Sequence, residues 1–149
     1  MKRYVSLSLT ILCIIFIYCN SLFNAEISST HSGYVLKFIQ KILEAAGLPP
    51  ALITEHVVRK LAHFCEYALL GLLGTVTAQF WYGGLKSHIF KILFWGLFIP
   101  VTDEFLQLFV EGRAGLVQDI VLDFSGFIFG MMVCIGSRYM FNWLKPRLG

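Results

Sequence analysis

Charged residues are scarce in this chain of 149 residues, because Asp, Glu, Lys and Arg together make up only 14% of it. A soluble domain usually contains about 25%. The sequence also lacks CxxC pairs, which argues against zinc ribbons and thioredoxin-like redox sites. Its formal net charge of +3 is too small to indicate a nucleic-acid partner. These shortages argue against a nucleic-acid-binding arm and an ordinary soluble enzyme.

Apolar residues, in contrast, are abundant and fall into four long stretches. The hydrophobic fraction is 57% and the mean hydropathy is +0.72, which excludes a disordered chain and indicates an integral membrane protein. About 20 apolar residues in a helix cross a hydrocarbon core of about 30 Å. Short links predict antiparallel neighbours, so we expect an all-α membrane protein, a bundle of four transmembrane helices in one domain, residues 1–149. The predicted spans are residues 4–23, 61–81, 89–110 and 116–140.

The first span has the features of an uncleaved signal anchor. Met1, Lys2 and Arg3 form a basic flank before it, as in a signal peptide, but no small-x-small cleavage site follows. We therefore expect the span to remain in the mature protein as a transmembrane helix, and cleavage is the alternative.

The longest polar interval, residues 24–56, opens with a turn rich in Ser, Thr and Asn. Apolar residues between Val35 and Leu43 then recur at helical spacing, with charged and amide side chains between them. Gly47, Pro49 and Pro50 predict the end of this helix, since proline lacks the backbone N–H. The helix is too short and polar to span, so we predict one extracytoplasmic amphipathic helix lying on the membrane. Packing over the bundle is the alternative.

Basic residues are unevenly distributed between the two ends of the predicted spans. With the N-terminus in the cytoplasm, the inner side carries seven basic residues and no acid, whereas the outer half carries five basic residues and all nine acids. Because Lys and Arg favour the cytoplasmic side, we expect both termini inside and the interval 24–56 outside. The inner basic residues are Lys2, Arg3, Lys86, Lys91, Arg138, Lys145 and Arg147.

The second span begins with a polar stripe. Lys60, His63, Tyr67 and Gly71 follow one another at spacings of three and four, which places them on one face of a helix. Glu66 lies off this stripe and is expected to face another neighbour or the headgroups.

The third and fourth spans carry matching stripes of acids and an amide. Asp103 and Gln107 share a helix face, and Glu104 is rotated from them by about 100°. Asp119 and Asp123 form the stripe of the fourth span, with glycines following at helical spacing. All three stripes fall at one depth, in the outer half of the bundle.

Ionised groups at this depth are not expected to face lipid, because each costs about 2.5–3.5 kcal/mol in a helix centre. We therefore predict that the stripes converge on a polar cluster that opens outward, with Arg113 above it. Its functional interpretation is a site for a polar ligand or a lipid headgroup. The candidate ligand-binding residues are Lys60, His63, Tyr67, Asp103, Glu104, Gln107, Arg113, Asp119 and Asp123.

Two other interpretations of the cluster remain open. Ion pairs of Lys60 or Arg113 with Asp103 or Asp119 could simply fix the helix register, and buried pairs are weak evidence of function. The carboxylates and His63 could also supply metal ligands. Only one histidine lies in the cluster and the sequence has no paired histidine motif, so we expect no metal or cofactor and assign no catalytic residue.

The polar stripes and the glycines form three motifs in a fixed order. They consist of Lys60, His63, Phe64, Tyr67, Leu70 and Gly71; of Asp103, Glu104, Gln107, Gly112 and Arg113; and of Asp119, Gly126 and Gly130. In this order they resemble the pattern of the VanZ-like family of small bacterial membrane proteins, over about residues 59–130. Asp123 departs from the pattern, because it places a charge where the family usually has asparagine.

The resemblance implies a multi-pass protein of the bacterial cytoplasmic membrane. The family's namesake is associated with resistance to the glycopeptide antibiotic teicoplanin, which acts outside this membrane on lipid-linked cell-wall precursors. Membrane lipids, an envelope lipid precursor or a lipoglycopeptide are therefore the partners that the resemblance suggests. An outward-facing polar cluster lies on the compatible side of the membrane.

Three functions compete at this point. The first is a non-enzymatic envelope protein that binds a lipid or another amphiphile. The second is a membrane-embedded enzyme, such as a metal-dependent hydrolase, with the carboxylates and His63 as acid–base groups. The third is an ion-coupled transporter, since intramembrane acids mark such paths. The almost purely apolar inner half argues against the third, because transport needs a polar path across the membrane.

Overall fold

The computed structural model describes residues 1–144, and this part of the chain consists of helices without a strand. The all-α prediction is therefore confirmed. Lys145 and Arg147, which we counted among the inner basic residues, lie outside the described part. The elements are α1 (Lys2–Ser21), α2 (Ala25–Ala45), the short 3-10 helix η1 (Pro50–Leu52), α3 (Glu55–Tyr82), α4 (Ile89–Gln107) and α5 (Val117–Leu144).

Three of these helices, α1, α3 and α5, are long and apolar enough to cross a membrane, and they coincide with the first, second and fourth predicted spans. The third predicted span corresponds to α4, which has 19 residues. Because α4 is short, every 18-residue segment of it contains Lys91, Asp103 and Glu104, whereas α1, α3 and α5 each contain an apolar segment of that length with at most two charges. A fourth span therefore stays a prediction. The third span was predicted to end at Val110, but α4 ends at Gln107. The backbone N–H groups of residues 108–110 each bond to the carbonyl three residues earlier, and these turns lead to Gly112, which has a φ of 74°.

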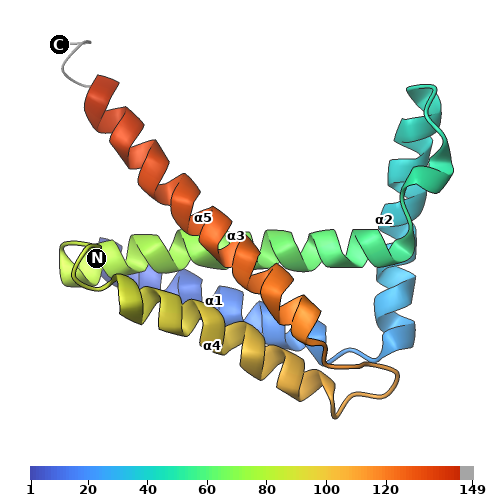
Figure 1. Cartoon of the computed structure of the whole chain (residues 1–149), viewed down its shortest axis with the longest axis horizontal. Coiled ribbons are helices and arrows are strands. Elements are labelled where there is room, and N and C mark those ends of the chain that lie inside the picture. The colour runs from blue at the N-terminus through green and yellow to red at the C-terminus, as the bar shows by residue number, and fades with distance from the viewer. Residues whose placement is uncertain (145–149) are drawn as a thin grey trace.

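The bundle helices alternate in direction, as the short links predict (Figure 1). At one end Ser21 of α1 meets Asp103 of α4, and Lys60 of α3 meets Asp119 of α5. At the other end the Trp81 indole donates to the backbone carbonyl of Arg3, 3.3 Å away. We call the first of these the pocket end and the second the far end. Helix α2 projects away from the bundle at the pocket end, and α5 crosses over α3.

The predicted turn at the start of the polar interval is wrong, because α2 already begins at Ala25. Its serines are compatible with a helix since they hydrogen-bond to the preceding turn: Ser32 Oγ donates to the carbonyl of Ser28 at 2.9 Å. The predicted end of the helix is confirmed. Helix α2 stops at Ala45, and Gly47 follows with φ of 74°, a left-handed conformation that favours glycine.

Helices α3 and α5 form the most extensive contact in the molecule, and glycines make it possible. A Cβ atom on Gly71 would overlap the carbonyl oxygen of Phe127, and a Cβ atom on Gly130 would overlap that of Ala68. A Cβ atom on Gly126 would also come too close to the backbone, 2.5 Å from the carbonyl oxygen of Phe64. The Gly-x-x-x-Gly spacing of Gly126 and Gly130 permits this close approach of the two helices. We call this contact, made by Gly71, Gly126 and Gly130, the glycine seam.

Candidate functional site

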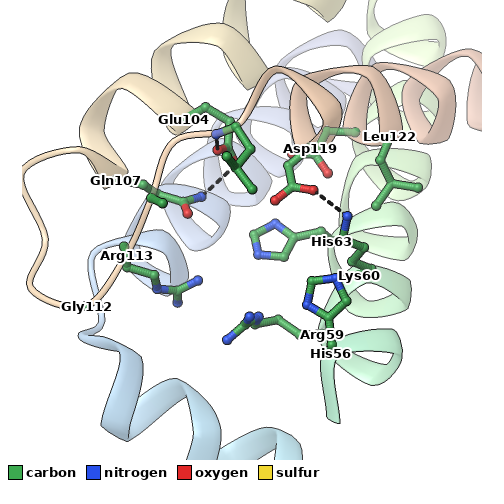
Figure 2. Close-up of a pocket in the computed structure, with 13 residues that line it drawn as sticks. His56, Arg59, Lys60, His63, Glu104, Gln107, Gly112, Arg113, Asp119 and Leu122 are labelled. Carbon is green, nitrogen blue, oxygen red and sulfur yellow. Dashed lines mark hydrogen bonds and ion pairs between the residues drawn. The ribbon is translucent and has the colours of Figure 1, made fainter. Parts of the chain in front are cut away.

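A polar pocket of about 180 Å³ lies at the pocket end, between α3, α4, α5 and the loop 108–116 (Figure 2). The pocket brings together most of the predicted ligand-binding residues. Tyr67 and Asp103 do not line it, and both are fully buried in the helix packing beside it. The predicted residues that line the pocket are Lys60, His63, Glu104, Gln107, Arg113, Asp119 and Asp123.

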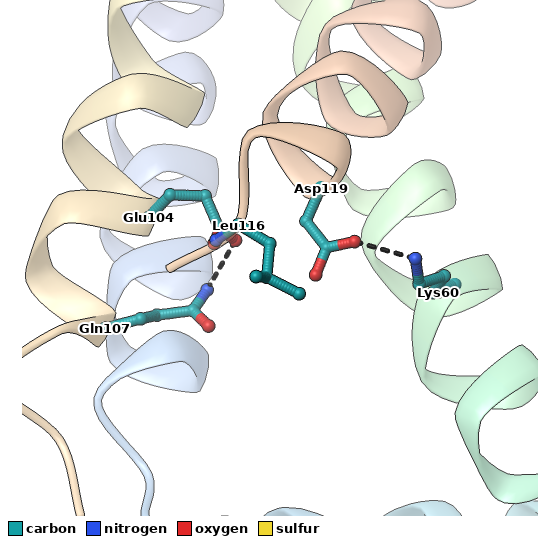
Figure 3. Close-up of polar contacts among 5 residues, drawn as sticks. All are labelled: Lys60, Glu104, Gln107, Leu116 and Asp119. Carbon is teal, nitrogen blue, oxygen red and sulfur yellow. Dashed lines mark hydrogen bonds and ion pairs between the residues drawn. The ribbon is translucent and has the colours of Figure 1, made fainter. Parts of the chain in front are cut away.

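One of the expected ion pairs is present in the pocket wall. Lys60 Nζ lies 2.8 Å from Asp119 Oδ1, and the two side chains are 31% and 26% exposed (Figure 3). Arg113 does not pair with an acid in the described part of the chain. Its Nε donates instead to the backbone carbonyl of Phe23, at 3.2 Å. The ion-pair interpretation therefore accounts for Lys60 and Asp119, and leaves the other carboxylates of the cluster unexplained.

Glu104 is fully engaged with its own protein. Its Oε1 accepts a hydrogen bond from Gln107 Nε2, and its Oε2 accepts one from the backbone N–H of Leu116, both at 2.9 Å (Figure 3). The side chain is only 4% exposed. Glu104 thus fastens the end of α4 to the residue just before α5 and positions the loop that carries Arg113.

His63 and Asp123 form the floor of the pocket and Asp103 lies directly behind them, so three different helices contribute to this cluster. One nitrogen of His63 and one oxygen of each aspartate all lie within 4.8 Å of one another. The Ser21 hydroxyl donates to Asp103 Oδ2 at 2.8 Å, so α1 contributes to the cluster as well. Several buried atoms here have no aligned hydrogen-bond partner in the described part of the chain. They are His63 Nδ1, Tyr67 Oη, Asp103 Oδ1 and both carboxylate oxygens of Asp123.

The mouth of the pocket carries two guanidinium groups that point toward one another, those of Arg59 and Arg113 (Figure 2). Burial, and secondly the positive charge of Arg59, lower the pKa of Arg113 from its ordinary value. Arg59 and His56 both line the pocket, and neither was among the residues predicted for the site from the sequence. Helical spacing contains the signal that could have found them, because Arg59 precedes His63 by four residues and His56 precedes Lys60 by four.

A second, mostly apolar groove of about 330 Å³ adjoins the pocket, between α2, α3 and the end of α1. Its apolar lining includes Val35 and Ile39 of α2 together with Val58 and Leu61 of α3. The groove and the pocket have three lining residues in common, which are Arg59, His63 and Arg113. The sequence could not reveal this groove, because its walls come from helices whose relative placement no local pattern fixes.

Glu66, which the stripe analysis placed off the polar face of α3, also lines this groove. Its Oε1 accepts a hydrogen bond from Asn20 Nδ2 at 2.9 Å. Glu66 therefore faces a neighbouring helix, α1, which was one of the two predicted alternatives. Asn20 and Ser21, both polar and both at the end of the apolar first span, are thus the residues through which α1 contributes to the site.

Comparison with known protein families identifies the family of this chain. The family described as VanZ/LLP1 matches residues 6–141, nearly the whole length. No curated protein and no solved structure matches the chain. The match includes all three motifs noted in the sequence and extends beyond them to α1 and α2, so this chain belongs to the VanZ/LLP1 family.

Proposed function

We propose that this protein is a non-enzymatic membrane protein that binds an amphiphile with an anionic headgroup at its pocket end. The observation that carries the proposal is the junction between the polar pocket and the apolar groove. The two cavities have Arg59, His63 and Arg113 in common. A headgroup in the pocket and a hydrocarbon chain in the groove would therefore be held by one continuous surface.

The arginines at the mouth favour an anionic headgroup. Arg59 has no hydrogen bond or ion pair with another side chain in the described part of the chain, and it faces a second cation in Arg113. An anion between the two guanidinium groups relieves their repulsion. Arginine also presents a planar fork of donors that binds phosphate or carboxylate in a bidentate manner. A phosphate or carboxylate headgroup is thus the ligand chemistry that fits this mouth.

The orientation that we propose places this pocket in the outer leaflet of the bacterial cytoplasmic membrane. Helices α1, α3, α4 and α5 would span the membrane, and α2 would lie on its outer surface. Basic residues at the far end support this arrangement. Arg3 lies over the rings of Tyr4 and Trp81, 4.8 and 5.4 Å from their centroids, a combination typical of a membrane interface.

Teicoplanin resistance, which the VanZ resemblance suggests, is compatible with the same pocket. Both candidate partners, a lipoglycopeptide and a lipid-linked envelope precursor, combine a polar headgroup with a hydrocarbon chain. Either partner would reach a pocket that opens to the outer leaflet. We therefore include teicoplanin among the ligands to be tested, beside an anionic phospholipid.

The test compares Arg59→Ala with Lys86→Ala in detergent-purified protein. Native mass spectrometry would count adducts formed with dioleoylphosphatidylglycerol, with dioleoylphosphatidylcholine and with teicoplanin. We expect the wild type to prefer phosphatidylglycerol over phosphatidylcholine. Arg59→Ala should lose this preference by about tenfold, since a hydrogen bond to a charged group contributes about 1.5–3 kcal/mol. Lys86→Ala removes the same charge from an exposed loop at the far end and should bind as the wild type does.

Stability measurements make this experiment decisive. Removing Arg59 also removes its repulsion of Arg113, so the melting temperature of Arg59→Ala should equal or exceed that of the wild type. Weaker binding with undiminished stability is the expected combination. If Arg59→Ala and Lys86→Ala lose equal amounts of lipid, or if the wild type shows no preference for the anionic headgroup, the proposal is wrong.

A further inference from the structure

We propose that a metal site lies at the floor of the pocket, where His63, Asp103 and Asp123 bind a divalent transition-metal ion such as Zn²⁺ or Mn²⁺. The sequence offered only one histidine in the cluster and no paired motif, which argued against a metal. The fold changes this assessment, because it assembles three ligands that are far apart in the sequence. The proposal concerns the metal alone and does not depend on the lipid proposed above.

The three side chains lie close enough together to converge on one metal ion. One potential ligand atom from each residue lies within 4.8 Å of the other two. A zinc ion lies about 2.0–2.2 Å from nitrogen and oxygen ligands, so small side-chain rotations toward a common centre would complete the site. One imidazole and two carboxylates form a donor set suited to Zn²⁺ and Mn²⁺.

The burial of the carboxylates points independently to a cation. Asp103 and Asp123 are both 0% exposed, and Asp103 Oδ1 and both oxygens of Asp123 have no aligned hydrogen-bond partner in the part of the chain described. No basic side chain forms an ion pair with either aspartate in the described part of the chain, since Lys60 pairs with Asp119 and Arg113 Nε donates to a backbone carbonyl. A buried charge without a partner is costly, and coordination of a metal removes that cost.

The surroundings of the triad resemble the outer shell of a metal site. The Ser21 hydroxyl holds Asp103 Oδ2 at 2.8 Å, which orients the carboxylate, and Oδ1 has no aligned hydrogen-bond partner in the described part of the chain. His63 and Asp123 line the pocket, whereas Asp103 lies behind them. The remaining coordination positions of a bound ion would therefore face the pocket, an arrangement of three protein ligands with an open side.

The experiment measures metal binding by the full-length protein in detergent. After treatment with a chelator and reconstitution with ZnCl₂ or MnCl₂, inductively coupled plasma mass spectrometry would give the metal content. We expect one equivalent of metal in the wild type, together with a rise in melting temperature on reconstitution. Asp103→Asn and Asp123→Asn should each weaken binding by more than about tenfold. Ser21→Ala, which removes only the outer-shell hydrogen bond, should weaken it by about 10–100-fold.

Glu44→Gln provides the control, because it makes the same change from carboxylate to amide at an exposed position of α2 that lines neither the pocket nor the groove. This variant should bind metal as the wild type does. A wild type that retains no stoichiometric metal would overturn the proposal whatever the variants do, and would indicate that the buried aspartates are protonated instead. Equal losses in Glu44→Gln and Asp123→Asn would also overturn it.

Discussion

Helices α3 and α5 meet in two ways within a few turns of each other, at the glycine seam and at the pocket end. In the seam, Gly71 and Gly130 each lie directly against the backbone of the other helix. At the pocket end, the same two helices supply His63 and Asp123, whose buried polar atoms lack aligned partners in the described part of the chain. The seam is closely packed, whereas the pocket end contains buried polar groups without an aligned hydrogen-bond partner in the described part of the chain.

The cavities at the two ends of the bundle also differ in the polarity of their linings. The pocket at the mouth of the bundle is lined by charged and polar groups. A larger cavity of about 400 Å³ lies toward the far end, between α1, α3 and α4, and its lining is mostly apolar, including Leu7, Ile14 and Leu70. An apolar cavity within a membrane protein suits hydrocarbon, so its size alone is no argument for specificity. The polar pocket, although smaller, is the better candidate site.

The largest effect that we predict is on the seam. Gly130→Leu would drive a side chain into the backbone carbonyl of Ala68, where no side-chain rotation can relieve the overlap. Overpacking typically costs about 1–3 kcal/mol, and a backbone obstacle places this variant at or beyond the upper limit. We expect Gly130→Leu to lose most of its folded population, measured as monodisperse protein recovered from membranes by size-exclusion chromatography.

The control for this prediction is Gly136→Leu on the same helix. A Cβ atom at Gly136 meets nothing within 4 Å, so the substitution adds the same volume without a clash. Its yield should match that of the wild type. Equal yields from Gly130→Leu and Gly136→Leu would show that the seam does not hold the two helices together.

We expect an intermediate loss of stability when Glu104 is replaced. Glu104 lies at the pocket end, but like the glycine seam it holds elements of the fold together. Glu104→Ala would leave the Leu116 N–H and the Gln107 amide without their acceptors. An unsatisfied buried group costs about 1–3 kcal/mol. Thermal unfolding in detergent should therefore show a clear loss of stability, with Glu111→Ala in the exposed turn as the control. Unchanged stability in Glu104→Ala would mean that Glu104 serves a ligand rather than the loop.

The sequence predicts the helices well because their signals are local. The length of the apolar segments defines α1, α3 and α5. The spacing of Gly126 and Gly130 indicates that α5 can approach a neighbouring helix closely, and this neighbour is α3. The convergence of polar residues could also be predicted, since stripes at one depth on neighbouring antiparallel helices must face a common centre or lipid. The start of α2 was missed because Ser and Thr favour turns by local propensity, and here they satisfy their hydroxyls within the helix.

The sequence predicted which residues belong to the site better than it predicted what each of them does there. Glu104, Asp119 and Asp123 are chemically alike in the sequence, yet one fastens a loop, one pairs with a lysine and one is buried without an aligned partner in the described part of the chain. Distances between helices decide these roles, and helical periodicity contains no information about them. The groove was invisible for the same reason, because it depends on where α2 lies against α3.

The smallest effect that we predict concerns the ion pair at the rim of the pocket, where the structural and functional interpretations of the cluster meet. Lys60 Nζ and Asp119 Oδ1 are 2.8 Å apart, but about a third and a quarter of their side chains are exposed, at 31% and 26%. Solvent screening reduces such pairs to about 0.2–1 kcal/mol, compared with about 3–5 kcal/mol for breaking a fully buried pair. A double-mutant cycle of Lys60→Met and Asp119→Asn, measured by thermal unfolding, should therefore give a coupling energy below about 1 kcal/mol that falls as salt is added. A coupling of several kcal/mol, insensitive to salt, would show that the pair fixes the helix register, and would make stability rather than binding the main role of the rim.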